Sequence, residues 1–211
     1  MDARPTCVIV TGRPGAGKTT LAKKLAALLH MPMLSRDEIK EGYVGTFGVS
    51  HDKLPAGTNR TVTDVFSASV RMLLQAQVSL VAEAAFQHRL WQKIVPRWSD
   101  VSQLFVVICR ADPELCAQRH LDRGLSDPAR EFYHGDRRVR VFKETGEFLR
   151  PGEYDPPAFD LPTLEVSTFQ GYAPGLSDII EFIMRSNIKP GLMPWSRMRR
   201  NRANLRRQAR T

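Results

Sequence analysis

The sequence predicts a three-layer α/β domain built around a five-stranded parallel sheet. Short apolar runs alternate along the chain with segments of helical periodicity, which is the pattern of parallel βαβ units. The first apolar run leads into a glycine-rich turn, and a helical pattern follows at once. The chain has 211 residues, of which 42% are hydrophobic and 25% are charged, values typical of one globular domain with a sizeable core.

Five short runs rich in apolar and β-branched residues are the expected strands, at positions 7–11, 33–35, 78–82, 103–109 and 163–167. The expected helices occupy 18–29, 36–40, 61–77, 88–98, 113–123, 136–145 and 178–185. Asp112 followed by Pro113 is a typical helix start, because the carboxylate caps free N–H groups and proline fits the first turn. Residues 42–59 contain four glycines and a proline, so an irregular loop is expected there. Trp91 and Trp98 are expected in the core.

A phosphate-binding loop stands between the first strand and the first helix. Residues 12–19 match the pattern G-x-x-x-x-G-K-T/S with a strand before it and a helix after it, the context that supports the motif. Glycines let backbone N–H groups approach phosphate oxygens, and the helix dipole directs its positive end at the same anion. Lys18 is expected to contact the β- and γ-phosphates, and the Thr19 hydroxyl to ligate Mg²⁺. The residues expected to bind the nucleotide here are Gly12, Arg13, Pro14, Gly15, Ala16, Gly17, Lys18, Thr19 and Thr20.

Two carboxylates follow neighbouring strands and are expected to meet at the same sheet edge as this loop. Asp37 comes two residues after the second strand, where it can face a phosphate acceptor and take its proton as a general base. The alternative for Asp37 is a helix N-cap. Glu83 ends the third strand and is a further candidate for Mg²⁺ or for orienting the substrate. The alternative for Glu83 is a buried salt bridge.

The phosphate-binding loop, the segment Ser35-Arg36-Asp37-x-x-Lys40 and Glu83 together resemble the P-loop small-molecule and polynucleotide kinases. Members include polynucleotide 5′-hydroxyl kinase, chloramphenicol phosphotransferase, gluconate kinase and the zeta toxins. The resemblance covers about residues 6–186 and implies phosphoryl transfer from ATP to a hydroxyl group, with Asp37 as the base. In polynucleotide kinases an arginine three residues after the base binds a substrate phosphate. Lys40 occupies that position here, which implies that it contacts the substrate.

Three arginines resemble those around the lid of adenylate-kinase-like enzymes. Arg119 and Arg123 form the R-x-x-x-R pattern of the helix that precedes the lid, and Arg130 lies in the expected lid, at about residues 123–136. The resemblance implies that Arg119 packs on the adenine, that Arg123 reaches the phosphates, and that Arg130 contacts the substrate side. It also implies that Thr168 borders the adenine. Lid guanidinium groups stabilise the charge of a transferring phosphoryl group. The alternative is a solvated helix face.

The net charge of +9 is concentrated at the C-terminus. From Arg185 onward there are nine basic residues and no acidic one, so the 22 other Lys and Arg residues balance the 22 Asp and Glu residues of the body. We therefore expect a kinase domain over residues 1–186 and a basic extension over 187–211. Such an extension could bind a nucleic-acid backbone, or it could be a solvated tail.

Three functions remain open from the residues. The first is a kinase that phosphorylates a hydroxyl-bearing small molecule. The second is a polynucleotide 5′-hydroxyl kinase that uses the basic extension, and the third is a non-kinase ATP-binding regulatory module. No Asn-Lys-x-Asp motif is present, which argues against a GTPase. No apolar run of about 18 residues, no signal peptide and no metal-like spacing of the three cysteines are found, so a cytoplasmic protein with free thiols is expected. The identity of the acceptor and the oligomeric state are not specified by the sequence.

Overall fold

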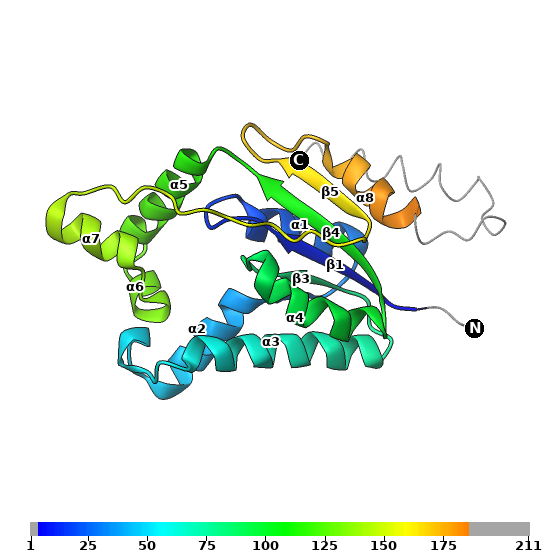
Figure 1. Cartoon of the computed structure of the whole chain (residues 1–211), viewed down its shortest axis with the longest axis horizontal. Coiled ribbons are helices and arrows are strands. Elements are labelled where there is room, and N and C mark those ends of the chain that lie inside the picture. The colour runs from blue at the N-terminus through cyan, green and yellow to red at the C-terminus, as the bar shows by residue number, and fades with distance from the viewer. Residues whose placement is uncertain (1–3, 186–211) are drawn as a thin grey trace.

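The computed structural model describes residues 4–185, which form a single five-stranded parallel sheet covered by helices (Figure 1). The sheet order is β2-β3-β1-β4-β5, and every neighbouring pair of strands is parallel. The strands are β1 (Thr6–Thr11), β2 (Met33–Ser35), β3 (Leu80–Glu83), β4 (Gln103–Arg110) and β5 (Thr163–Ser167). The predicted fold class is confirmed.

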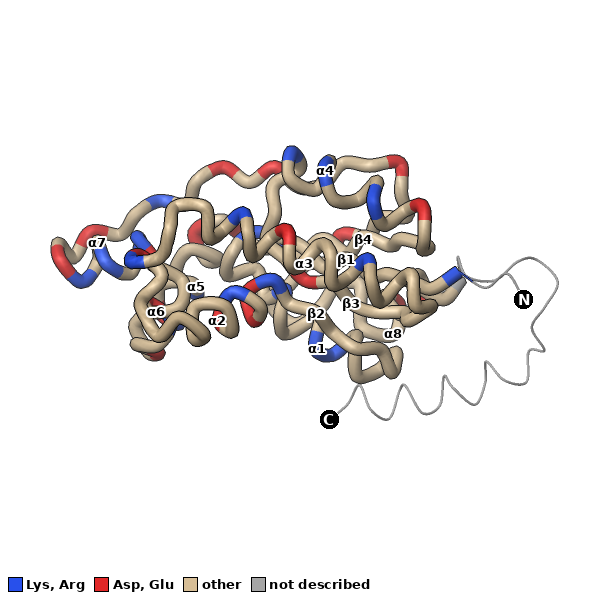
Figure 2. Tube along the Cα trace, turned by 90° about the horizontal axis from the view of Figure 1, so that it is seen from below, with Lys and Arg blue, Asp and Glu red and all other residues tan. Residues whose placement is uncertain are grey.

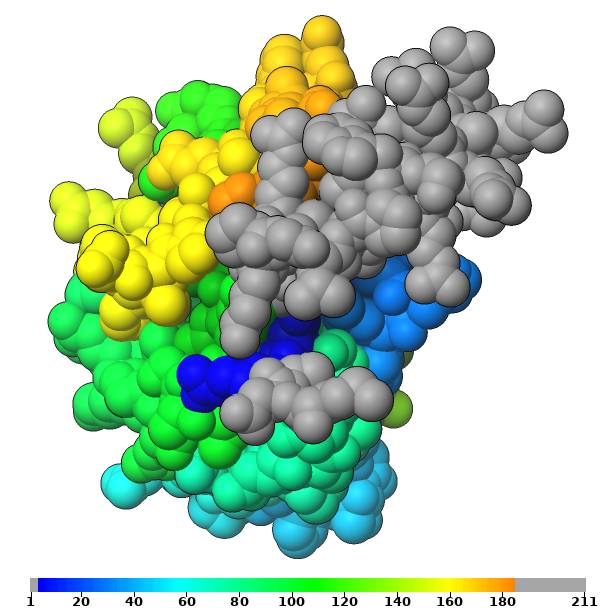
Figure 3. Space-filling model, turned by 90° about the vertical axis from the view of Figure 1, so that its right-hand side faces the viewer, coloured from blue at the N-terminus to red at the C-terminus, as the bar shows by residue number. Residues whose placement is uncertain are grey.

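Helices cover both faces of the sheet and give three layers. Figure 3 views the edge at which β1 begins, with α8 on one side of the sheet and α3 and α4 on the other. A short 3₁₀ helix, η1 (His51–Lys53), precedes α3. The α-helices are α1 (Lys18–Leu29), α2 (Arg36–Phe47), α3 (Thr58–Gln75), α4 (His88–Ser99), α5 (Pro113–Ser126), α6 (Ala129–His134), α7 (Arg137–Thr145) and α8 (Leu176–Arg185).

The core is divided by the sheet into two clusters, because successive strand residues point to opposite faces. Cys7 and Ile9 of β1 pack toward α3 and α4, where Trp91 and Trp98 are fully buried. Val8 and Val10, together with their neighbours on β4, pack toward α1 and α8. Both tryptophans therefore belong to the core, as predicted. The three cysteines are buried and free, and burial raises the pKa of the Cys109 thiol to about 12.

The prediction of an irregular loop at residues 42–59 is wrong over most of that range. Helix α2 continues to Phe47, η1 follows after a short turn, and α3 begins at Thr58. Glycine inside a helix costs about 1 kcal/mol, and tertiary packing outweighs that cost here. Val44 is fully buried, and the exposed end of α2 lies against α6. The helix ends at Gly48, which adopts a left-handed conformation with a φ of 64°.

The basic extension at 187–211 and the domain boundary near 186 lie outside the described residues. The prediction that the extension binds nucleic acid is therefore neither supported nor opposed by the fold. Over residues 4–185, none of the helices has the length and apolar character needed to cross a membrane.

Candidate active site

The loop between β1 and α1 has the backbone that its glycines predict. Gly12, Gly15 and Gly17 all have positive φ angles, of 144°, 84° and 76°. A side chain at Gly12 would also place its Cβ 2.6 Å from the Cys109 carbonyl oxygen, so only glycine fits. Gly17 is the N-cap of α1 and makes no side-chain capping bond. The first N–H groups of α1 thus remain available to an anion, as phosphate binding requires.

Lys18 and Glu83 lie together at the carboxyl edge of the sheet. The Lys18 ammonium donates to the Arg13 carbonyl oxygen at 3.3 Å and lies 4.0 Å from Glu83 Oε1. Glu83 Oε2 accepts a hydrogen bond from the Ser35 hydroxyl at 2.8 Å. Burial raises the pKa of Glu83, whereas the Lys18 charge and the Ser35 hydrogen bond act in the opposite direction. Glu83 therefore forms the buried ion pair that was the alternative, in a position that also faces the phosphate-binding loop.

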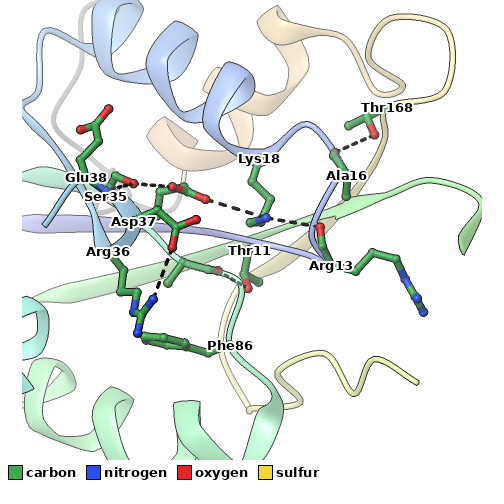
Figure 4. A network of polar contacts seen from close by, with 12 residues as sticks. Thr11, Arg13, Ala16, Lys18, Ser35, Arg36, Asp37, Glu38, Phe86 and Thr168 are labelled. Atoms are coloured by element: carbon green, nitrogen blue, oxygen red, sulfur yellow. Dashed lines mark hydrogen bonds and ion pairs between the residues drawn. The ribbon is translucent and has the colours of Figure 1, made fainter. Parts of the chain in front are cut away.

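Asp37 projects from the first turn of α2 toward the same edge (Figure 4). It is not the N-cap, because Ser35 holds that position and its hydroxyl accepts from the Glu38 N–H. The Asp37 side chain is 54% exposed and lies 3.5 Å from the Arg36 guanidinium. Partial desolvation raises its pKa, but the charges of His134 and other basic neighbours outweigh this, so the pKa lies below the ordinary value. Asp37 is accordingly ionised at neutral pH and able to accept a proton.

The loop after β5 is tied to the phosphate-binding loop. The Thr168 hydroxyl donates to the Ala16 carbonyl oxygen at 2.9 Å, and the Thr168 N–H donates to the Arg110 carbonyl oxygen at 2.8 Å. Arg119 on α5 donates to the carbonyl oxygens of Thr168 and Phe169 at 3.2 and 3.1 Å. Arg119 and Thr168 therefore lie together beside the phosphate-binding loop. The resemblance to adenylate-kinase-like enzymes predicts that adenine binds there.

Arg123 is within electrostatic range of Asp37, Glu83 and Arg130. Desolvation lowers the pKa of Arg123, and the charge of Arg130 lowers it further, while Asp37 and Glu83 act in the opposite direction. Arg123 lies near the end of α5 and Arg130 on α6. Arg123 thus acts on the same space as the two carboxylates, and the expected contact of Arg130 with the substrate stays a prediction.

The lid expected at about residues 123–136 includes α6, which contacts α2 and η1 (Figure 1). Lys40 donates to the His134 carbonyl oxygen at 3.1 Å, and His134 Nε2 lies 2.8 Å from Glu41 Oε1. Arg140 forms an ion pair with Asp52 at 2.6 Å. A side chain at Gly135 would collide with His51 and Asp52, so this contact needs glycine.

Lys40 is buried under this lid contact instead of lying with the acceptor residues. Only 4% of it is exposed, and burial lowers its pKa to about 8. It is absent from the residues that line the cleft beside Asp37. The geometry gives Lys40 a lid-holding contact, and its role as a substrate ligand stays a prediction that this position does not favour.

A cleft of about 610 Å³ opens beside Asp37 between α2, α3 and α4, and we call it the acceptor cleft. Its polar side includes Asn59 and Thr63 of α3, and its apolar side includes Phe86 and Ile94. Nothing local in the sequence marks these residues, because the sheet order brings α3 and α4 to Asp37. The volume lies within the usual range for small-molecule sites.

Sequence reasoning also missed the segment at 151–155, which lies along the phosphate-binding loop. The Arg13 side chain points away from Lys18 (Figure 4), donates to the Gly152 carbonyl oxygen at 3.0 Å and lies over the Tyr154 ring. Tyr154 Oη lies 3.1 Å from Thr11 Oγ1. A pocket of about 220 Å³ lies among these residues. The Arg13 side chain is therefore engaged with this segment, and its backbone belongs to the phosphate-binding loop.

The residues at this edge fit ATP with Mg²⁺. Thr19 lies in the first turn of α1, and the carboxylates of Asp37 and Glu83 are nearby. Between residues 4 and 185, no group of three or more His, Cys, Asp or Glu side chains is arranged to hold a metal ion by itself. Mg²⁺ is commonly held by one or two protein oxygens together with substrate phosphates, and this donor set suits that arrangement.

Comparison with known proteins supports the nucleotide-binding assignment. Residues 7–145 match the family described as AAA domain. The chain is 27% identical over 205 residues to the ATPase subunit HslU of an ATP-dependent protease from Thermotoga maritima. That match covers 94% of this chain but only 40% of the relative, so the chain spans less than half the length of that subunit.

Solved structures with the same fold include kinases. A candidate kinase from Chloroflexus aurantiacus has a TM-score of 0.70 at 24% identity, covering 88% of this chain and 100% of that one. The APS kinase CysC from Mycobacterium tuberculosis, solved with AMPPNP and APS, has a TM-score of 0.59 at 18% identity, covering 86% and 98%. At these identities the likeness establishes the fold alone.

Proposed function

We propose that this chain, which belongs to the AAA domain family and has the P-loop kinase fold, is an ATP-dependent kinase for a hydroxyl-bearing small molecule. One observation carries the proposal. An ionised carboxylate, Asp37, borders the acceptor cleft at the sheet edge that also holds Lys18 and the phosphate-binding loop. A module that only binds or hydrolyses ATP has no need of a small-molecule cleft beside such a group.

The side chains have distinct roles in this proposal. Asp37 takes the proton of the acceptor hydroxyl while the acceptor oxygen bonds to the γ-phosphorus. The bond between that phosphorus and the β–γ bridging oxygen breaks, and ADP leaves. Lys18 and the N-terminus of α1 hold the phosphate oxygens, and Arg123 and Arg130 stabilise the spread charge from the lid. Mg²⁺, held through Thr19, would neutralise phosphate charge.

Two other functions use the same nucleotide site. A polynucleotide 5′-hydroxyl kinase would hold nucleic acid with residues 187–211, which lie outside the described residues. A regulatory ATP-binding module is the remaining alternative, and the similarity to a protease ATPase subunit is its main support. The acceptor cleft favours the small-molecule kinase over both.

The test compares two neighbouring acidic residues. Asp37 borders the cleft, whereas Glu38 points away and pairs with Lys23 at 3.2 Å. Both Asp37→Asn and Glu38→Gln are assayed for phosphate transfer from ATP to a panel of sugars, antibiotics, nucleosides and 5′-hydroxyl oligonucleotides. We expect Asp37→Asn to lower transfer by roughly 10²- to 10⁴-fold, as for the loss of a general base, with unchanged ATP affinity. We expect Glu38→Gln to remain near wild type. Equal transfer by the two variants would remove Asp37 as the base.

A further inference from the structure

The acceptor cleft carries more positive than negative side chains. Its basic side chains are Arg36, Arg60, Lys93 and Arg97, and its acidic side chains are Asp37 and Asp64. Figure 2 shows basic positions along α4, which supplies two of the four. An excess of positive charge in a small cleft must be balanced by pairing within the protein, by solvent ions or by the ligand itself.

Two of the four basic residues are already paired. Arg36 lies 3.5 Å from Asp37, and its guanidinium also donates to the Asn59 side-chain oxygen at 3.0 Å. Arg60 Nε lies 3.8 Å from Asp64 Oδ2, one turn away on α3. Each acid of the cleft therefore has a basic partner of its own.

Lys93 and Arg97 are the basic residues left over. Within residues 4–185, neither has an acidic side chain at ion-pair distance. Both are exposed, and they lie one turn apart on α4, where like charges destabilise the helix. A single anion between them would remove that repulsion and gain two charge-assisted hydrogen bonds.

The position of this pair along the cleft sets the length of the ligand. Helices α3 and α4 run side by side away from the sheet edge that holds Asp37 (Figure 1). Trp98 donates to the Ser67 carbonyl oxygen at 3.1 Å. Arg97, the neighbour of Trp98, therefore lies beside Ser67, which is about two turns of α3 beyond Asn59. With a rise of about 1.5 Å per residue, Lys93 and Arg97 lie roughly 6 and 12 Å beyond the start of the cleft.

We propose that the acceptor is an alcohol that also carries an anionic group, a phosphate or a carboxylate, which Lys93 and Arg97 bind. The hydroxyl then lies at Asp37, and the body of the molecule contacts Phe86 and Ile94. This inference rests on the proposed kinase function. It favours a small molecule over a polynucleotide, because one cleft of about 610 Å³ with two unpaired cations suits one or two anionic groups.

The test uses related alcohols with and without an anionic group: glucose, gluconate and glucose 6-phosphate, and ribose with ribose 5-phosphate. Phosphate transfer is measured for the wild type, Lys93→Gln, Arg97→Gln and the control Arg89→Gln. Arg89 is an exposed cation on the same helix that does not line the cleft. In parallel, titration calorimetry measures binding of the same compounds in the presence of a non-hydrolysable ATP analogue. Comparing the carboxylate with the phosphate member identifies the preferred anion.

We expect the anionic member of a pair to have the lower KM, and each cleft variant to raise that KM by about tenfold with little change in kcat. Higher salt should raise the same KM in the wild type, and Arg89→Gln should behave as the wild type. Equal KM values for neutral and anionic members, or a strong preference for a 5′-hydroxyl oligonucleotide, would overturn the inference while leaving transfer intact. If no alcohol is phosphorylated, the kinase proposal fails. The calorimetry then tests the anion site by itself. Binding that is selective for the anionic compounds and is lost in Lys93→Gln supports this inference, whereas equal binding of neutral and anionic compounds overturns it.

Discussion

The nucleotide side and the acceptor side of this molecule are held together in different ways. On the nucleotide side, the buried Thr168 hydroxyl bonds the Ala16 carbonyl oxygen, and Arg119 bonds two carbonyl oxygens of the loop after β5. On the acceptor side, α6 and α7 are joined to α2 and η1 by the buried Lys40 and by ion pairs between partly exposed side chains. Examples are the Arg140–Asp52 and His134–Glu41 pairs.

This difference separates a preformed site from an adjustable one. Breaking a buried hydrogen bond leaves an unsatisfied polar group, whereas a partly exposed ion pair contributes little, about 0–1 kcal/mol. We therefore expect the phosphate-binding loop to be better fixed than the contact that the partly exposed ion pairs make with α2 and η1. Such a division suits an enzyme that binds ATP in a fixed site and closes over a variable acceptor.

The largest effect is expected from Lys18→Ala on the nucleotide side. Lys18 is buried beside the phosphate-binding loop, where its ammonium donates to the Arg13 carbonyl oxygen. We expect transfer to fall by roughly 10²- to 10³-fold, as for the loss of one donor to developing charge. Lys23→Ala, which removes an exposed lysine of the same helix, is the matched control. Similar rates for the two variants would show that Lys18 does not act on the reacting phosphate.

The next effect comes from the lid. Arg123→Ala and Arg130→Ala should each lower kcat by about 10²-fold with little change in ATP affinity, because their charges act on the transferring group. Arg137→Ala, at an exposed arginine of α7, is the control. If the variants lose ATP affinity while kcat is unchanged, these arginines bind ATP in the ground state and do not stabilise the transition state.

A smaller effect is expected from Thr168→Val, which removes the bond to the Ala16 carbonyl oxygen. The free energy of unfolding in denaturant should fall by about 1 kcal/mol, and ATP affinity should fall with it. Thr163→Val removes an exposed hydroxyl at the start of β5, the strand that precedes Thr168, and should change neither quantity. Unchanged ATP affinity in Thr168→Val would show that this bond does not preform the loop.

A separate effect, on the pH dependence of stability, concerns Lys40 beneath α6. Its pKa falls from 10.5 to about 8 on burial, so the unfolded chain binds more protons between these values. The free energy of unfolding therefore rises as the pH increases from about 8 to 10.5, because the unfolded chain binds more protons than the folded chain over this range. In Lys40→Met this contribution is absent, so the unfolding free energy of the wild type should rise relative to the variant from pH 8 to 10.5. Parallel pH curves would contradict the buried position.

Local patterns explain why much of the nucleotide side could be predicted. The phosphate-binding loop, Asp37 and the Asp112 cap of α5 each depend on a few consecutive residues, and the cap is confirmed. The acceptor side depends on contacts between distant segments. Thr11 and Tyr154 are 143 positions apart, and α4 meets Asp37 only because β3 lies between β1 and β2. The spacing of Lys93 and Arg97 is visible in the sequence, but their place in a cleft is not.

The central claim is that the γ-phosphoryl group moves to an alcohol and not to water. Phosphorus NMR of the full chain with ATP, Mg²⁺ and the acceptor panel follows both products in one spectrum. The account predicts a new phosphate monoester resonance that grows with ADP and requires an acceptor. Release of inorganic phosphate alone, at the same rate with and without every acceptor, would contradict it.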